Sequence, residues 1–166
     1  MESTSLDLPD SVQRVVACLR QAGHSGEVVM LPDTGKTSAE AAAGLGCSVA
    51  EIAKSVVFRR LSDDAAVMVV ASGANRVDEH KVAAHTGPLG KANAAFVREK
   101  TGYAIGGVCP VGHPSRLIML IDQDLCRYPR VWAAAGHPHA VFPLTPQQLQ
   151  QMTGAPLADI AQQIAE

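Results

Sequence analysis

Apolar residues near the start of the chain recur at helical spacing. Between Val12 and Leu19 they lie three or four positions apart, with polar residues between them. Ser11 is a good residue to cap a helix, and Gly23 is a good residue to end one. This pattern predicts an amphipathic helix over residues 11–22.

Two capping boxes follow one another closely. Thr37 with Glu40 opens a short alanine-rich helix, and Ser48 with Glu51 opens a second. Lys54 then stands at the predicted end of the second helix, directly before a run of apolar residues. We therefore expect rigid elements on both sides of this lysine.

Residues 55–61 and 66–72 are rich in valine and are separated by the polar turn Ser62-Asp63-Asp64. This arrangement predicts a β-hairpin. Other short apolar runs predict strands over 28–31, 117–121, 131–134 and 140–142, with a turn over 32–35.

The remaining signals are helical. They predict helices over 79–84, 93–102 and 145–154, and a last amphipathic helix through Leu157, Ile160 and Ile164. Helices and strands are mixed without a strict βαβ rhythm. We therefore expect an α+β fold with a compact, mixed, largely antiparallel sheet flanked by helices.

Composition narrows the class. Of 166 residues, 47% are hydrophobic and 18% charged, as in a globular protein with one core, so residues 1–166 are expected to form a single domain. No apolar run is long enough to cross a bilayer, and the first ten residues do not resemble a signal peptide. A cytoplasmic location without membrane contact is the expectation.

The net charge of −2 is unevenly distributed. Residues 54–130 hold 11 Lys and Arg against seven Asp and Glu, a net of +4, and the rest of the chain has a net of −6. A basic middle on an acidic protein is suited to local contacts with phosphates.

The glycine-rich stretch Gly106-Gly107-Val108-Cys109-Pro110 carries the main candidate chemistry. Two adjacent glycines allow positive φ and a close approach to a ligand, and proline fixes the exit of the turn. Such a loop can direct backbone N–H groups at a developing oxyanion, and a lysine such as Lys54 can add positive charge.

Cys109 and the histidines offer other chemistry. None of the four cysteines forms a CxxC pair, so free thiols are expected, and Cys109 is interpreted as a loop residue with a nucleophile as the alternative. His137 and His139 are spaced to share a metal on a strand, but Pro138 interrupts the strand and no third ligand follows, so no metal site is predicted.

The order of several short motifs resembles the YbaK/prolyl-tRNA synthetase-associated domain family, and the similarity runs over about residues 8–165. These proteins are freestanding relatives of the editing insertion domain of bacterial prolyl-tRNA synthetase. The matching segments are Thr37–Ala41, Ile52–Phe58, Asn75–Asp78 with Lys81, Thr101–Tyr103, Gly106–His113, Ala135–His137, and Phe142–Pro146 with Leu149 and Thr153-Gly154.

The resemblance implies a partly barrel-like sheet flanked by helices and a hydrolase that removes a small amino acid (Ala, Ser, Thr or Cys type) from mischarged tRNA. It implies no cofactor. The acceptor end of aminoacyl-tRNA is the expected partner, and an aminoacyl-tRNA synthetase is a candidate partner. Two alternatives stay open: a non-catalytic aminoacyl-tRNA-binding module, and a small-molecule hydrolase that depends on Cys109.

The resemblance also assigns roles to residues. Lys54 matches the functional lysine of the family, and Gly106 and Pro110 match the ends of its GxxxP loop. We expect catalysis by Lys54 with the backbone of Gly106 and Gly107. Further residues are expected to bind substrate (Val108, Cys109, Pro110, His113, His137) or tRNA phosphates (Arg59, Arg76, Lys81).

Overall fold

The protein is described by a computed structural model that covers residues 8–32 and 37–162. Five α-helices and two 3-10 helices are present in this part of the chain. They are α1 (Asp10–Gln21), α2 (Ser38–Leu45), η2 (Val49–Glu51), α3 (Glu79–Thr86), α4 (Ala94–Thr101), η3 (Gln123–Arg127) and α5 (Pro146–Thr153).

The described residues also form eight strands, all in one sheet. They are β1 (Val29–Met30), β2 (Ile52–Arg60), β3 (Ala66–Ser72), β4 (Leu89–Lys91), β5 (Ile118–Asp122), β6 (Val131–Ala134), β7 (Ala140–Leu144) and β8 (Leu157–Ala158).

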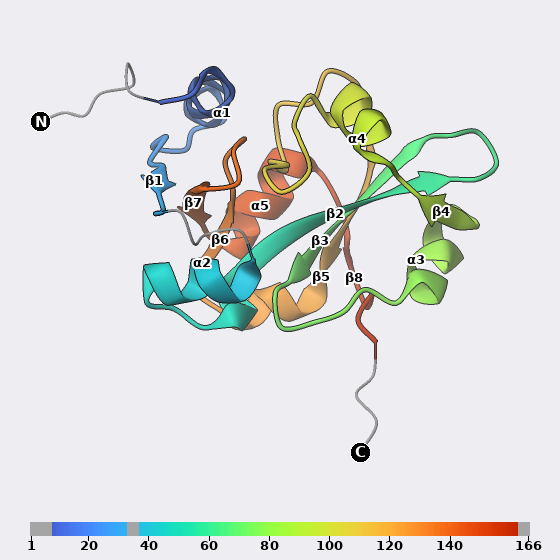
Figure 1. Cartoon of the computed structure of the whole chain (residues 1–166). Coiled ribbons are helices and arrows are strands. Elements are labelled where there is room, and N and C mark those ends of the chain that lie inside the picture. The colour runs from blue at the N-terminus through green and yellow to red at the C-terminus, as the bar shows by residue number, and fades with distance from the viewer. Residues whose placement is uncertain (1–7, 33–36, 163–166) are drawn as a thin grey trace, which may run out of the picture.

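The sheet has the order β1-β7-β6-β2-β3-β5-β8, and the short strand β4 pairs with β2 off this path. Antiparallel pairing joins β1 to β7, β6 to β7, and β2 to both β3 and β4. Parallel pairing joins β2 to β6, β3 to β5, and β5 to β8. The predicted α+β fold, with a mixed and largely antiparallel sheet flanked by helices, is confirmed (Figure 1).

Short-range polar signals set the ends of most helices. The side chains of Thr37, Asp78, Asn93 and Thr145 each accept a hydrogen bond from a backbone N–H in the first turn of their helix. Glycines at positions 46, 102 and 154 end α2, α4 and α5 in the left-handed conformation, where a side chain is costly. The predicted helices at these places are confirmed.

The hairpin of β2 and β3 is also confirmed, but its first strand begins earlier than predicted. Ile52 is the first residue of β2, and Lys54 lies inside the strand opposite Ala71. The second capping box at Ser48 opens only a three-residue 3-10 helix. The prediction of Lys54 at a helix-to-strand junction was therefore wrong by two residues, because Ile52 and Ala53 already pair with β6, and Ala53 also pairs with β3.

The predicted C-terminal helix was wrong. Residues Leu157 and Ala158 form β8 beside β5, and Ala161 bridges to Val77. Sheet pairing therefore replaces the helix that the spacing suggested, while Ile164 lies outside the described residues, as does most of the turn predicted over 32–35. The strand β4 was not predicted.

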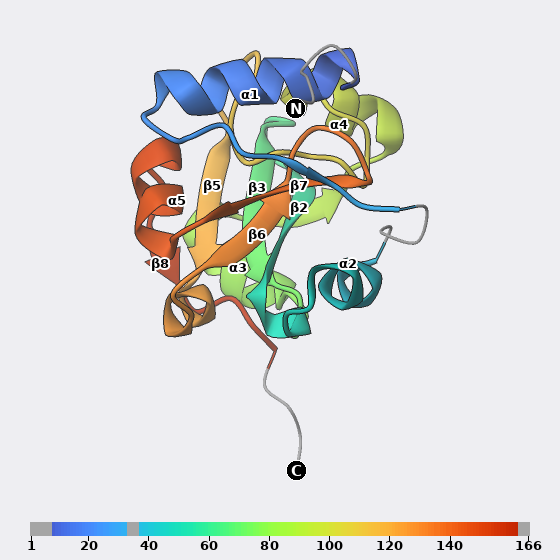
Figure 2. The same cartoon turned by 90° about the vertical axis from the view of Figure 1, so that its left-hand side faces the viewer.

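The helix α1 lies across one end of the sheet (Figure 2). Its apolar stripe is buried. The stripe packs into the main core with residues of β6 and β7. Ser11 does not cap this helix as predicted. Its hydroxyl instead donates to the Gly136 carbonyl at 2.6 Å, which ties α1 to the turn between β6 and β7. Within the described residues, no helix has both the length and the apolar character needed to cross a membrane.

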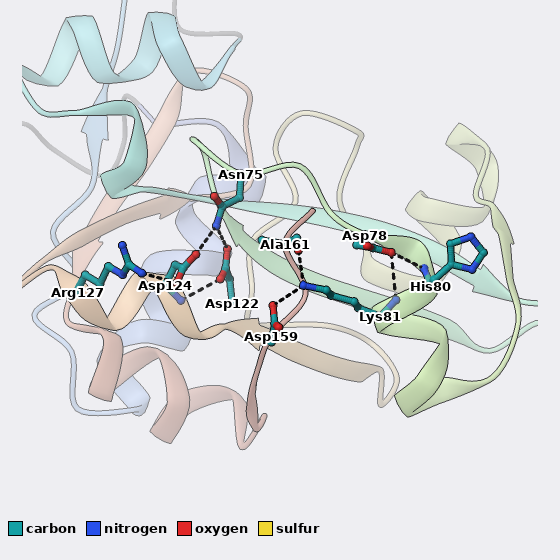
Figure 3. A network of polar contacts seen from close by, with 9 residues as sticks. All are labelled: Asn75, Asp78, His80, Lys81, Asp122, Asp124, Arg127, Asp159 and Ala161. Atoms are coloured by element: carbon teal, nitrogen blue, oxygen red, sulfur yellow. Dashed lines mark hydrogen bonds and ion pairs between the residues drawn. The ribbon is translucent and has the colours of Figure 1, made fainter. Parts of the chain in front are cut away.

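A partly buried polar cluster lies at the ends of β3 and β5. Asp122, which is 1% exposed, accepts from the Ser72 N–H, from the Asn75 side chain and from the Asp124 N–H. Asn75 also donates to Asp124, so one amide bridges two carboxylates (Figure 3). We call Ser72, Asn75, Asp122 and Asp124 the Asp122 cluster. It holds the loop after β3, which carries Arg76, against the end of β5.

Candidate active site

A cavity opens where two parallel strands separate. Strand β2 pairs with β6 only at Ile52 and Ala53, and beyond these residues the two strands diverge. Ligand sites are common at the carboxyl ends of parallel strands that diverge in this way. The cavity has a volume of about 230 Å³, and we call it the Lys54 cavity. Its described lining is Thr37, Ser38, Ala41, Ile52, Ala53, Lys54, Ser55, Gly106, Val108, Trp132, Ala134, Pro138, Ala140 and Val141.

Lys54 supplies the charge of this cavity. Burial lowers the pKa of its ammonium group, the nearby Arg76 lowers it further, and Asp122 opposes the shift. Among the described residues, none accepts a hydrogen bond from its Nζ atom. A partly buried ammonium group beside a second cation favours an anionic or strongly polar ligand.

The glycine loop contributes Gly106 and Val108 to the lining of the same cavity. Gly106 has a φ of +95°, and a Cβ atom there would reach nothing closer than Pro138 at 3.7 Å. Gly107 has a different reason to be glycine, because a Cβ atom would lie 2.7 Å from the backbone nitrogen of His137. The first glycine provides conformation, and the second allows the loop to pack against the turn between β6 and β7.

Only part of the loop backbone is available to a ligand. The Gly107 N–H donates to the Ala104 carbonyl at 3.0 Å, so it is already used within the loop. The N–H groups of Gly106 and Val108 have no partner among the described residues, and both of these residues line the Lys54 cavity. The proposed backbone donors therefore become Gly106 and Val108, in place of Gly106 and Gly107.

Three of the predicted substrate-binding residues lie elsewhere. Pro110 and His113 line a separate cavity between α1 and α5, and Cys109 is fully buried and lines neither cavity. The Cys109 carbonyl hydrogen-bonds His113 Nε2 at 2.8 Å. Burial lowers the pKa of His113, partly offset by this hydrogen bond. The structure therefore does not bring these residues to Lys54.

The basic residues predicted to bind tRNA also separate. Only Arg76 is close enough to Lys54 to affect its pKa. Arg59 forms an ion pair with Asp64 at 2.7 Å near the hairpin turn. Lys81 pairs with Asp159 at 3.0 Å and donates to the Ala161 carbonyl, which fastens the C-terminal segment to α3 (Figure 3).

His137 and His139 lie in the turn between β6 and β7, and not on a strand. Their rings are 5.4 Å apart between centroids, and the His139 N–H donates to His137 Nδ1. His137 supports the glycine loop through its backbone, while its neighbour Pro138 lines the Lys54 cavity. In the part of the chain that the structure describes, no group of three His, Cys, Asp or Glu side chains is placed to hold a metal ion.

Several lining residues were not predicted. Ser55 follows the lysine directly and could have been found within the Ile52–Phe58 motif, but nothing distinguished its hydroxyl. Trp132, Ala134 and Val141 come from β6 and β7, some 80 residues later, and no local signal connects them to Lys54.

Comparison with known proteins identifies the family of the chain. Residues 33–152 match the model of the aminoacyl-tRNA editing domain. The chain belongs to the aminoacyl-tRNA editing domain family. This match spans the α2 segment, Lys54, the glycine loop and β7, and so includes all the described residues that line the Lys54 cavity.

Individual relatives cover nearly the whole chain. A solved structure described as that of a candidate trans-editing enzyme for prolyl-tRNA synthetase is 43% identical, with a TM-score of 0.89 over 95% of this chain and 100% of that chain. The hypothetical protein APE2540 is 30% identical, with a TM-score of 0.82 over 90% of this chain and 99% of that chain. The uncharacterized protein YwhH of Bacillus subtilis (strain 168) is 30% identical over 86% of this chain and 91% of its own length.

Proposed function

We propose that this protein is a trans-editing hydrolase that removes a small amino acid from mischarged tRNA. Family membership supports a role in aminoacyl-tRNA editing, and the proposal adds the reaction and its residues. The main support is that Lys54 and the glycine loop line one cavity, although Gly106 is 52 positions after Lys54 in the sequence. At about 230 Å³ this cavity is smaller than the roughly 300–1,000 Å³ of pockets for drug-sized ligands, which suits a small acyl group.

The ester bond of aminoacyl-tRNA is already activated, so its hydrolysis does not require a protein nucleophile. It requires a positioned water molecule and stabilisation of the tetrahedral oxyanion. The N–H groups of Gly106 and Val108 are the proposed donors to that oxyanion. Lys54 and Arg76 form a pair of neighbouring cations that suits the phosphate of the terminal nucleotide.

Proton transfer is assigned to the substrate. None of the described lining residues is His, Asp or Glu, so this part of the wall offers no ordinary general base. The free hydroxyl of the terminal ribose lies next to the ester in every aminoacyl-tRNA. It is the group we propose to relay the proton from the attacking water.

The Cys109-dependent alternative has little support. Burial raises the pKa of the Cys109 thiol to about 12, and the side chain is fully buried. A nucleophilic thiol needs the thiolate form and access to substrate. We expect Cys109→Ala to keep most of the deacylation rate, with a modest loss of thermal stability from the small cavity it leaves.

The test is single-turnover deacylation of tRNAs charged with Ala, Ser, Thr, Cys and Pro. The proposal expects rapid release of at least one small amino acid and slow release of proline from its cognate tRNA. Tight binding of charged tRNA without release would favour the binding module. Alkylation of surface thiols serves as the control, and it should leave the rate unchanged.

A further inference from the structure

The edge of β2 has a gap in its pairing. In an antiparallel pair, alternate residues direct their N–H and C=O groups to opposite edges of the strand. The Gly73 N–H donates to the Ile52 carbonyl, and the Arg60 N–H donates to the Ala65 carbonyl. Even-numbered residues of β2 therefore bond to β3, and the backbone of Ser55 faces the opposite edge.

Ser55 lies in the gap on that edge. Strand β6 pairs with β2 only as far as Ala53, and β4 pairs with it only from Phe58 onward. Between these pairings, no strand of the described chain pairs with Ser55 on this edge.

The Ser55 side chain is also without a partner. Its Oγ atom is buried and makes no hydrogen bond to the described part of the chain. Buried hydroxyls are nearly always hydrogen-bonded, so an unpaired one needs an explanation. A ligand that supplies the missing partner would satisfy it.

Ser55 separates two cavities. Beside the Lys54 cavity lies a second cavity of about 220 Å³, and Ser55, Gly106 and Val108 line both. The rest of the second cavity is apolar, so the Ser55 hydroxyl is its one polar side-chain group among the described lining residues. The other lining residues are Val56, Val57, Ala92, Val97 and Ile105.

Gly106, a proposed donor to the ester, lines both cavities, as Ser55 does. The side chain of an acyl group bound at Gly106 can therefore lie close to Ser55. Rotation about χ1 moves the serine hydroxyl among three staggered positions, so a change of rotamer can bring it toward a group bound at this boundary. The apolar second cavity leaves room for a methyl group next to that hydroxyl.

We propose that Ser55 selects the acyl group by hydrogen-bonding to a hydroxyl on its β-carbon, so that seryl and threonyl esters are preferred over alanyl esters. This inference rests on the deacylase activity proposed above. A site that hydrogen-bonds a substrate hydroxyl discriminates against an analogue without it, since the buried polar group is then left unpaired. Size alone would separate serine from alanine poorly.

The experiment compares seryl-tRNA and alanyl-tRNA deacylation, as kcat/KM, in wild type and in Ser55→Ala. We expect the seryl-to-alanyl preference to fall by about 10-fold, the effect of losing one buried hydrogen bond, with the alanyl rate kept. Ser55→Thr retains the hydroxyl and should retain most of the preference. Ser62→Ala, which removes an exposed serine from the hairpin turn, is the matched control and should change neither rate.

Two results would overturn the inference while leaving the deacylase activity in place. Equal losses for both esters would mean that Ser55 contacts a group common to all substrates, such as the α-amino group. An unchanged preference would mean that Ser55 only forms part of the wall. If the wild type releases none of the tested amino acids, the proposed function itself fails.

Discussion

Ser72 and Ser55 lie on adjacent strands, but only the hydroxyl of Ser72 is hydrogen-bonded. Ser72, at the end of β3, donates to the Ala50 carbonyl at 2.8 Å, and its N–H donates to Asp122. Ser55, on β2, has a buried hydroxyl without a partner in the described chain. The Asp122 cluster satisfies its polar groups internally, whereas the Lys54 cavity leaves polar groups unsatisfied where a ligand can reach them.

The two regions therefore hold two kinds of polar group: those that are hydrogen-bonded within the fold and those left without a partner. A buried polar group gains stability only when its hydrogen bonds are made, and an unmade bond costs roughly 1–3 kcal/mol. The Asp122 cluster therefore contributes to stability, and the Lys54 cavity is expected to cost stability. Strain and unpaired groups of this kind are common at functional sites.

The largest expected effect is on turnover at Lys54. We expect Lys54→Ala to reduce single-turnover deacylation by at least about 10²–10³-fold, the usual cost of removing one electrostatic contact to a transition state. Lys54→Arg should also be slow, because a planar fork replaces a compact charge. Circular dichroism and thermal unfolding should show an intact fold, and wild-type rates in Lys54→Ala would remove this residue from the mechanism.

Substitutions of the two loop glycines, Gly106 and Gly107, should reduce stability for different reasons. In Gly107→Val the new side chain would collide with the His137 backbone, so we expect a loss of about 1–3 kcal/mol of stability together with turnover. In Gly106→Ala the Cβ atom has room, and only the positive φ costs about 1–2 kcal/mol. Urea unfolding and single-turnover rates measured together test this order. Full activity in a stably folded Gly106→Ala protein would mean that the loop is only a turn.

The serine pair tests the comparison directly. Ser72→Ala removes a buried donor and leaves the Ala50 carbonyl unpaired, so we expect a loss of about 1–2 kcal/mol of unfolding free energy. Ser55→Ala removes a hydroxyl that has no described partner and should cost nothing or raise stability slightly. Denaturant unfolding of both variants gives the answer, and a larger loss for Ser55→Ala would contradict the division into two kinds of polarity.

The smallest expected effect is a shift in the pH profile. Burial and Arg76 lower the pKa of Lys54, so catalysis by the charged lysine is lost as pH rises through a pKa below the ordinary 10.5. Arg76→Gln removes one cause of this shift and should move the alkaline loss to higher pH, although burial keeps part of it. The enzyme-dependent rate, corrected for hydroxide-catalysed hydrolysis of the ester, is the measurement.

The same pKa has a consequence for stability. Because the folded-state pKa of Lys54 is lowered, the charged form is disfavoured by folding, and stability should rise as pH passes upward through that pKa. Lys54→Met removes a charge that burial disfavours, so it should not lower the melting temperature. A marked loss in Lys54→Met would show that the side chain also supports the fold.

Much of the fold could be predicted because its signals are local. Thr37, Asp78, Asn93 and Thr145 cap the helices that follow them, and each capping bond spans only two or three residues. The valine-rich hairpin and the glycine loop are likewise short segments with their own patterns. The pairing of Lys54 with this loop came from the resemblance to a known family, which covers both segments.

Tertiary structure decided what local patterns cannot express. The tail residues Leu157 and Ala158 became a strand because β5 offered an edge, although their spacing suggested a helix. His113 lines a different cavity and Cys109 is fully buried. The Gly107 N–H donates to the Ala104 carbonyl.

The partners of the basic residues were also decided by the tertiary structure. Arg59 and Lys81 looked as suitable for phosphate as Arg76, but Asp64 and Asp159 pair with them in the fold. The sequence by itself determined most helix ends, the valine-rich hairpin and the position of the glycine loop, because those depend on neighbours along the chain. Only the tertiary structure decided which polar groups are satisfied and which are left for a ligand, because partners such as Ala50 and Asp122 are brought together by packing and not by sequence distance.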